Sequence, residues 1–282
     1  MANKIILIGS TGFVGRNLKK LFLKRNINCV YLSSKNFDLD NLTKKKIKKF
    51  IPSNSIIIYA AGKHRKYGDT LKLKKYNLKI FINLLLKLKH SLPNKILFLS
   101  TVEIYGNKNK SYISERSKTN PLNLYAQSKL LQEIELKKFA TKNQIRINIL
   151  RLPGFYGKDD NHSIISKIYM FLNGKKKINF FTNGKELRDY VFIKDLTKII
   201  NLFVKNKNIK FDGVFNIVQG HSYQIKSYFH LIKKIINSDK KIIFGKSIGF
   251  DLRFNNKKLK IFLKKNKFKF STHKHSIKHD YC

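Results

Sequence analysis

Short apolar runs alternate with longer stretches of helical periodicity through the first half of this chain. Runs rich in Ile, Val and Tyr predict strands at residues 4–9, 28–33, 56–60, 96–100 and 146–152. Apolar residues at helical spacing predict helices near residues 12–25, 42–50, 71–90 and 123–143. Because strands that alternate with helices are typical of βαβ units, we expect an α/β fold with a Rossmann-type, doubly wound parallel sheet.

The pattern becomes less regular after Leu152. Glycines interrupt it, and the clearest elements are a strand near residues 190–193 and a helix from 195 to about 205. We therefore expect one domain over residues 1–153, rejoined by about 188–219, and a smaller, interleaved part over most of 154–282.

The chain is basic from about residue 257 to its end, and we expect a solvated, partly frayed tail there. His273, His275 and His279 lie near Cys282 in this tail, a combination that could suggest a metal site. A solvated tail accounts for these residues more simply, so no metal site is predicted.

A formal net charge of +44 would normally suggest nucleic acid or an anionic membrane surface as a partner. The lysines that supply this charge are spread along the whole chain, which favours a solvated, lysine-rich surface over a specific nucleic-acid site. The chain has two cysteines, no apolar core of a signal peptide, and no apolar run of the roughly 20 residues that span a bilayer. We therefore expect a cytoplasmic protein without a membrane span.

A glycine-rich turn, Gly9-Ser-Thr-Gly12-Phe-Val-Gly15, joins the first predicted strand to the first predicted helix. Gly9 permits a tight turn, Gly12 lets the backbone approach a phosphate, and Gly15 lets the helix pack close to the sheet. Amides at the start of such a helix can bind a pyrophosphate. Glycines also serve ordinary turns, so this motif is weak evidence by itself.

A second motif, Tyr125-Ala-Gln-Ser-Lys129, lies inside a predicted helix, where residues four apart share a face. An ammonium about 4 Å from a phenolate stabilises it by on the order of 4 kcal/mol at an effective dielectric constant of about 20, or roughly three pKa units. Such a tyrosine could transfer protons near neutral pH. Tyr and Lys are frequent in this chain, so the same spacing also arises by chance.

Between these two motifs, the segment Ser100-Thr-Val-Glu-Ile-Tyr-Gly106 follows a predicted strand. It brings hydroxyl groups and the Glu103 carboxylate to the carboxyl end of a parallel strand, where ligands of open α/β sheets bind. Incidental polar residues at a strand end would give the same pattern.

In this order and spacing, the three motifs together resemble the extended short-chain dehydrogenase/reductase superfamily, in particular its branch of NAD(P)-dependent nucleotide-sugar epimerases, dehydratases and reductases. The resemblance runs almost end to end and includes Tyr59-Ala-Ala-Gly62, Asn77, residues 150–157, residues 184–195 and residues 214–217. It implies an enzyme with an NAD(P)-binding domain over residues 1–153 and a substrate-binding part in the remainder. A nucleotide-sugar substrate, surface polysaccharide biosynthesis and a homodimer are further implications.

By this resemblance Tyr125 is the catalytic acid/base, Lys129 holds the nicotinamide ribose and lowers the pKa of Tyr125, and Thr101 binds the reacting sugar oxygen. Arg188 resembles the arginine that binds the substrate diphosphate, a role that suits its planar fork. An ordinary ion pair with Asp189 is the alternative for Arg188. The implied cofactor-binding residues are Gly9, Thr11, Gly12, Phe13, Val14, Gly15, Ser34, Lys35, Asp38, Leu39, Ala60, Ala61, Gly62, Asn77, Ser100, Tyr125, Lys129 and Leu152.

The end of the second predicted strand bears on the choice between NAD and NADP. It reads Tyr31-Leu-Ser-Ser-Lys35, without the acidic residue expected to bind an unphosphorylated ribose. Both cofactors stay open, with a lean to NADP, because Ser34 and Lys35 could bind a 2′-phosphate.

The sequence leaves the reaction open. Thr101 and Glu103 would contact the substrate in an oxidoreductase or epimerase that transfers a hydride. In a dehydratase or decarboxylase Glu103 would be the base, although Val102 stands where the 4,6-dehydratases that carry Thr-Asp-Glu have an acid. The third hypothesis, a non-catalytic protein that binds a dinucleotide or nucleic acid, is disfavoured by the intact set of Thr101, Tyr125 and Lys129.

Overall fold

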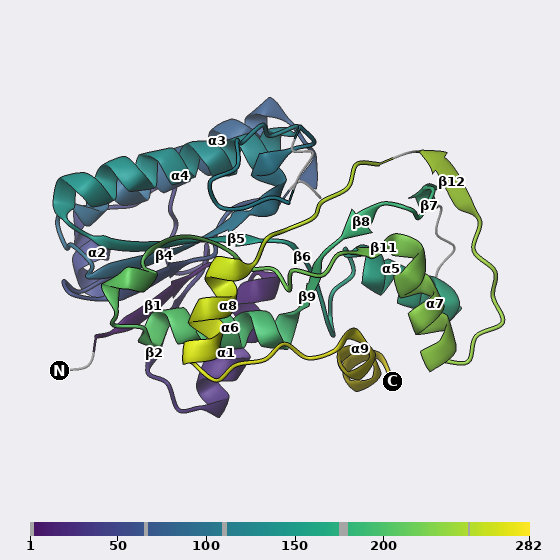
Figure 1. Ribbon diagram of the computed structural model, residues 1–282. Coiled ribbons are helices and arrows are strands. Elements are labelled where there is room, and N and C mark those ends of the chain that lie inside the picture. Colours follow the sequence, from purple (N-terminus) through teal and green to yellow (C-terminus); the bar gives the residue numbers. More distant parts are fainter. Residues whose placement is uncertain (1–2, 65–66, 109–111, 175–179, 248) are drawn as a thin grey trace. The chain divides into compact units, whose positions relative to one another are not determined.

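The computed structural model describes residues 3–64, 67–108, 112–174, 180–247 and 249–282 (Figure 1). The chain forms two compact units, between which it passes more than once. Unit 1 comprises Met1–Gly106, Thr119–Arg151 and Thr197–Phe215, and unit 2 comprises Asn107–Lys118, Leu152–Leu196 and Asn216–Cys282.

Unit 1 is built on a six-stranded sheet with the strand order β10-β5-β4-β3-β1-β2. The pairs that β1 forms with β2 and β3, and β3 forms with β4, are all parallel, as predicted. Its elements are β1 (Ile5–Ile8), α1 (Phe13–Lys24), β2 (Cys29–Leu32), α2 (Lys44–Phe50), β3 (Ile56–Tyr59), α3 (Leu71–Leu88), β4 (Lys95–Thr101), η2 (Val102–Tyr105), α4 (Leu124–Asn143), β5 (Arg146–Leu152), α6 (Ile193–Lys205), η3 (Ile209–Phe211) and β10 (Gly213–Asn216).

Helices cover both faces of this sheet. Figure 1 shows α3 and α4 over one face and α1 over the other. Alternate strand residues such as Ile57 and Tyr59 share a buried cluster with Phe81 of α3 and Leu136 of α4. Because both faces are covered, β3 is apolar and buried along its whole length, as expected for an interior parallel strand.

Unit 2 contains short strand pairs and five helices or helix segments among the residues that the structure describes. The pairs are β6 with β9, β8 with β11 and β7 with β12. Its elements are β6 (Gly154–Tyr156), α5 (Ile164–Leu172), β7 (Phe180–Thr182), β8 (Leu187–Arg188), β9 (Tyr190–Phe192), the first residues of α6, β11 (Tyr223–Gln224), α7 (Ile225–Ile235), β12 (Phe244–Ser247), α8 (Lys257–Lys265) and α9 (His273–Tyr281).

The predicted elements of unit 1 lie within a few residues of those in the structure, whereas most of unit 2 had no counterpart in the sequence analysis. Its strands are two to four residues long, too short for an alternating pattern to be recognised. The expected rejoining segment began near residue 188, but β8 and β9 pair with strands of unit 2. In the structure the returning segment is therefore Thr197–Phe215.

The prediction of a frayed, solvated tail from residue 257 was wrong. This part of the chain forms α8 and α9, which bury Leu259, Phe262, Leu263 and Ile277. The three buried residues of α8 recur at the three- and four-residue spacing of one helix face. The surrounding lysines obscured that pattern in the sequence.

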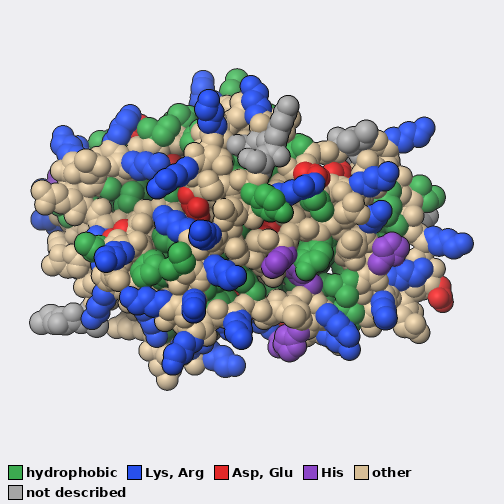
Figure 2. Space-filling model, viewed as in Figure 1, with side chains coloured by type: hydrophobic (Ala, Val, Ile, Leu, Met, Phe, Trp, Pro, Cys, Tyr) green, Lys and Arg blue, Asp and Glu red, His purple; other side chains and the backbone are tan. Residues whose placement is uncertain are grey.

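The lysine-rich surface is evident in the space-filling view, where Lys and Arg side chains are scattered over the visible face (Figure 2). Lys95 of unit 1 is an exception, because it is buried and its Nζ donates to the carbonyl oxygens of Phe203 at 2.9 Å and Asn206 at 3.3 Å. Burial lowers the pKa of Lys95 to about 8, an effect that nearby Asp212 opposes. Within the described ranges, no helix is long and apolar enough to cross a membrane.

Candidate active site

The strand ends of unit 1 bring most of the predicted site residues to one edge of the sheet. In the parallel register, Ile8 of β1 lies beside Tyr59 of β3, and Tyr59 lies beside Phe98 of β4. The glycine turn, residues 60–62 and Thr101 follow these positions and emerge at the same edge. The strand order reverses direction between β1 and β3, which is where open α/β sheets bind ligands.

Two glycines of the turn after β1, Gly9 and Gly15, have no room for a side chain. Gly9 has a φ of 92°, and a Cβ there would lie 2.7 Å from the backbone of Ala60. A Cβ on Gly15 would collide with the carbonyl oxygen of Gly9. Gly12 is the N-cap of α1 and provides no side-chain acceptor for the first amides of that helix. This open, amide-lined cradle fits a diphosphate.

The other predicted residues of this turn surround the helix start. Phe13 and Val14 are the first residues of α1, and the carbonyl oxygen of Thr11 accepts a hydrogen bond from Arg16 at 2.8 Å. The turn is held to the next strand because the amides of Gly9 and Ser10 both donate to Leu32 of β2.

The segment of residues 60–62 after β3 is held by Asn77 of α3. The buried Asn77 side chain accepts from the Lys63 amide at 2.8 Å and donates to the Lys63 carbonyl at 2.9 Å. Gln132 of α4 donates to the Asn77 carbonyl at 2.6 Å. Both polar atoms of the Asn77 side chain therefore fix the backbone at Lys63, directly after residues 60–62.

The predicted cofactor-binding residues after β2 differ in their exposure to solvent. Ser34 and Lys35 are exposed in a turn. The Asp38 carboxylate accepts hydrogen bonds from the Asn41 side chain and a neighbouring amide, which lower the pKa of Asp38. Leu39 is buried in the core of unit 1.

Lys129 lies on α4, one turn after Tyr125, and is buried. Its Nζ donates to the Leu99 carbonyl at 3.0 Å and lies 4.8 Å from the centre of the Phe98 ring. Burial lowers the pKa of Lys129 to about 8, and the carboxylate of Glu133 opposes this shift. The ammonium is thus held at the end of β4, at the same edge of the sheet as the glycine turn.

A buried network fixes α4 to β4 and β5. Arg151 of β5 forms a two-pronged ion pair with Glu133 of α4, with Nη2 at 2.7 Å from Oε2 and Nε at 3.1 Å from Oε1. Arg151 also donates to the Tyr105 hydroxyl at 2.7 Å. The Ser100 hydroxyl donates to Glu133. The structure thus gives the side chain of Ser100 a partner within the protein.

Thr101 and Glu103 are connected to the start of α4. The Thr101 hydroxyl accepts from the Glu103 amide at 3.2 Å, which caps η2. The Glu103 carboxylate accepts from the Asn123 side chain at 2.8 Å, and the oxygen of Asn123 caps α4 by accepting from the Ala126 amide at 2.7 Å. Glu103 therefore holds the residue that caps the helix of Tyr125.

Tyr125 itself contacts the loop between β3 and α3. Its ring lies 5.0 Å from the ring of His64, measured between ring centres. Its backbone amide donates to the Asp69 carboxylate at 3.0 Å. The structure thus brings Tyr125, Thr101 and Lys129 onto neighbouring elements of unit 1.

Arg188 and Leu152 belong to unit 2. Arg188 donates to the carbonyls of Leu187 and Phe250, and its guanidinium lies 5.3 Å from the centre of the Phe250 ring. Among the residues that the structure describes, Arg188 and Asp189 do not form an ion pair with each other. The Asp189 carboxylate instead accepts from the amides of Gln219 and Gly220, and burial raises its pKa to about 7.

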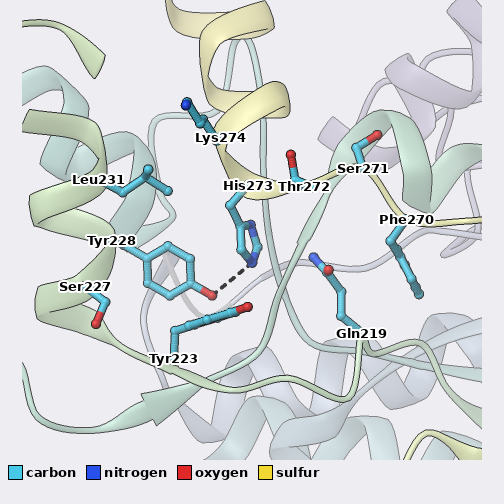
Figure 3. A pocket seen from close by; sticks show the side chains of 10 residues that line it. All are labelled: Gln219, Tyr223, Ser227, Tyr228, Leu231, Phe270, Ser271, Thr272, His273 and Lys274. Atoms are coloured by element: carbon cyan, nitrogen blue, oxygen red, sulfur yellow. Dashed lines mark hydrogen bonds between the residues drawn. The ribbon is translucent and has the colours of Figure 1, made fainter. Parts of the chain in front are cut away.

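Unit 2 also contains a cavity of about 320 Å³ that the predicted site residues do not line. It lies between α7 and the start of α9, and Figure 3 shows His273 reaching from α9 towards Tyr228. Both ring nitrogens of His273 form hydrogen bonds. Nδ1 lies 2.8 Å from the Tyr156 hydroxyl, and Nε2 lies 3.3 Å from the Tyr228 hydroxyl. Within the described ranges, no group of His, Cys, Asp and Glu could hold a metal ion.

Burial lowers the pKa of His273 to about 4, which predicts a loss of stability in mild acid. An unfolded imidazole has a pKa of about 6.5, so the unfolded chain takes up a proton first as the pH falls. The contribution of His273 is complete above about pH 6.5 and decreases as the pH falls towards 4, by about 3 kcal/mol in total. Urea unfolding at pH 7.5 and pH 5 should show a smaller pH dependence for His273→Gln than for the wild type. Equal pH dependence of the two proteins would contradict this account.

Several residues that shape the site were absent from the sequence analysis. They are Asp69, Asn123, Glu133 and Arg151, which position α4, and His64, which contacts Tyr125. Asn123 could have been found, because Asn before an apolar helical pattern is a common N-cap. The other contacts join segments that are distant in sequence.

A family model and several individual proteins match this chain. The model of the NAD dependent epimerase/dehydratase family matches residues 5–217. The chain belongs to this family. The predicted enzyme class, family and Rossmann-type fold are thereby confirmed.

Individual members of the family match most of the chain. GDP-L-colitose synthase of Yersinia pseudotuberculosis is 28% identical over 275 residues, which cover 89% of this chain and 87% of that protein. ADP-L-glycero-D-manno-heptose-6-epimerase of Brachyspira hyodysenteriae is 24% identical over 269 residues, which cover 83% and 81%. The UDP-glucose 4-epimerase of Thermotoga maritima, solved with UDP-glucose, has the same fold, with a TM-score of 0.85 at 18% identity over 99% of this chain and 97% of that chain.

Proposed function

We propose that this protein is an NAD(P)-dependent epimerase or reductase that acts on a sugar linked to a nucleoside diphosphate. The observation that carries the proposal is the common sheet edge, which unites the open glycine cradle after β1 with Thr101 and with the α4 helix of Tyr125 and Lys129. The Yersinia and Brachyspira relatives, which are named for GDP- and ADP-linked sugars, support the substrate class.

The residues of unit 1 fit a dinucleotide. Gly9, Gly12 and Gly15 would hold the diphosphate, and the buried Lys129 would hold the nicotinamide ribose. The nicotinamide supplies a carbon that accepts a hydride from a sugar or returns one to it.

The protein contributes proton transfer and orientation. As the hydride leaves a carbinol carbon, the phenolate of Tyr125 takes the hydroxyl proton, and in the opposite direction the phenol of Tyr125 returns a proton to the carbonyl oxygen. The Thr101 hydroxyl would hydrogen-bond the same oxygen, and the Lys129 ammonium would stabilise the phenolate. Arg188 of unit 2 would bind the substrate diphosphate.

Incubation of the purified protein with a panel of sugar nucleotides tests this function. Each substrate is supplied with NAD or NADPH, and products are identified by mass and by sugar configuration. We expect a change in configuration or oxidation state for at least one member of the panel. A protein that binds neither dinucleotide and converts no sugar nucleotide would refute the proposal.

We propose that NADP is preferred over NAD. Ser34 and Lys35 are exposed after β2, and no acidic residue stands at this position to bind an unphosphorylated ribose. Titration followed by the fluorescence of the reduced cofactor should give a lower Kd for NADPH than for NADH. Tighter binding of NADH would reverse this preference.

A dehydratase or decarboxylase is the second candidate, favoured by the presence of Glu103 two residues after Thr101 at the ligand edge. In such an enzyme the carboxylate would remove a proton from the sugar ring. The hydrogen bond that Glu103 accepts from Asn123 supports a different role, in which the carboxylate holds the start of α4.

Replacing Glu103 by Gln separates the two roles, because an amide oxygen can still accept from Asn123 but an amide cannot act as the base. In an epimerase or reductase, we expect Glu103→Gln to keep kcat within about threefold of the wild type. In a dehydratase, the same substitution should lower the rate of water elimination by about 100-fold or more. The measurement is kcat together with the product mass. Glu103→Ala, which removes both the base and the acceptor, should lower kcat in either case, and a Glu103→Ala enzyme as active as the wild type would contradict both roles.

A further inference from the structure

The segment between β3 and α3 ends in a carboxylate that binds the first turn of α4. Asp69 Oδ1 accepts from the Tyr125 amide at 3.0 Å, and Oδ2 accepts from the Leu124 amide at 3.2 Å. Amides in the first turn of a helix have no acceptor within that helix. Asp69 therefore supplies acceptors to two of them, and Asn123 supplies one to the third, at Ala126.

The same segment is anchored at its other end. Asn77 of α3 binds the backbone of Lys63 with both polar atoms of its side chain, and Gln132 of α4 binds the carbonyl of Asn77. Asn77 thus fixes the backbone at Lys63, and Asp69 binds the first turn of α4.

We propose that Asp69 is a positioning residue for Tyr125. By binding two successive amides it fixes the peptide planes on the N-terminal side of Tyr125, and so fixes the direction in which the phenol leaves α4. This inference rests on the proposed function and deepens it.

The charge of Asp69 has a second consequence. A carboxylate at a helix N-terminus interacts favourably with the helix dipole, but it opposes a negative charge on the nearby phenol. The other charged or titratable side chains around the start of α4 include His64, against the Tyr125 ring, Lys129, one turn along the helix, and Glu103, on Asn123. The ammonium of Lys74 of α3 also lies there and donates to Gln127 at 2.8 Å. Replacing Asp69 by Asn keeps one acceptor oxygen and removes the charge, so Tyr125 should ionise at lower pH.

Thr70 provides a matched control. It is the next residue in the chain, and its hydroxyl caps α3 by accepting from the Leu73 amide at 3.2 Å. Thr70→Ala therefore removes a helix cap from the same segment without touching α4. Both Asp69→Ala and Thr70→Ala should lower the thermal unfolding temperature, and Asp69→Ala should lower it more, because its carboxylate accepts two charge-assisted hydrogen bonds.

The test compares Asp69→Ala, Asp69→Asn and Thr70→Ala in the full chain. We expect Asp69→Ala to lower kcat by about tenfold or more, with KM and the Kd for the dinucleotide within about twofold of the wild type, because catalysis depends on sub-ångström placement. Thr70→Ala should keep kcat within about twofold. Hydrogen exchange at the amides of Leu124 and Tyr125 should accelerate in Asp69→Ala alone. In Asp69→Asn, the limb of the kcat/KM profile that reports ionisation of Tyr125 should move to lower pH, which is the acid limb for oxidation of the sugar and the basic limb for its reduction.

A double variant tests whether Asp69 acts through the phenol. If it does, Asp69→Ala should not lower the residual activity of Tyr125→Phe any further. The proposal is overturned if Asp69→Ala matches Thr70→Ala in kcat, or if it lowers the activity of Tyr125→Phe by the same factor as that of the wild type. A wild-type chain that binds no dinucleotide would overturn the proposed function and this inference together, whereas an active wild type with an unaffected Asp69→Ala variant overturns this inference alone.

Discussion

Replacing Tyr125 by Phe should lower kcat by about 10²- to 10⁴-fold, the usual contribution of a positioned acid or base. The variant removes one oxygen and keeps the ring that packs against His64, so the local structure should be retained. The measurement is kcat at saturating cofactor with the sugar nucleotide found in the substrate panel. Binding of the reduced cofactor should stay within about threefold, because the glycine cradle and Lys129 are unchanged.

Tyr112→Phe is the control for this substitution. Tyr112 is an exposed tyrosine of unit 2, 63% accessible to solvent, and the substitution removes the same hydroxyl group. The Tyr112→Phe variant should have the kcat of the wild type. Wild-type kcat in Tyr125→Phe would exclude the phenol as the acid/base and would leave the proposed mechanism without its central group.

Replacing Arg151 by Met should destabilise the protein by about 3–5 kcal/mol, because it leaves the Glu133 carboxylate buried without its cation. Both side chains of this pair are almost inaccessible, at 4% for Arg151 and 0% for Glu133. The loss should be visible as a lower midpoint in urea unfolding. The double variant Arg151→Met with Glu133→Gln should recover part of the loss, since the side chain of residue 133 is then neutral.

The exposed pair of Lys138 and Glu135 on the same helix is the matched comparison. Its atoms lie 2.8 Å apart, but the side chains are 68% and 36% accessible. Lys138→Met should therefore cost about 0.5 kcal/mol or less. If Arg151→Met costs no more than Lys138→Met, the buried network does not hold α4 in the way that its geometry implies.

The residues of the candidate site could be proposed from the sequence where they are close together in it. Gly9, Gly12 and Gly15 lie within a single turn, and Tyr125 and Lys129 lie one helical turn apart. The resemblance to a family then indicated that these segments act together. Asp69 was not predictable in this way, because it lies 56 residues before the amide of Tyr125 that it binds.

The tail of the chain was mispredicted for a different reason. Leu259, Phe262 and Leu263 carry the spacing of a buried helix face, so the signal was present in the sequence. The abundance of lysine favours solvation of the whole segment, and this feature dominates the sequence there. Lysine only requires that its own ammonium reach water, and the opposite face of the same helix can be buried.

For unit 1, the amino-acid sequence by itself determined the order of strands and helices, the approximate helix starts and the glycine turn. These depend on side-chain spacing and backbone freedom over a few residues, and such preferences act within each segment. Only the tertiary structure decided which strands are neighbours, which lysines are buried, and that Glu133 meets Arg151 beneath the helix of Tyr125. Burial and charge pairing decide these matters, because their energies depend on groups that approach each other only when distant segments of the chain pack together.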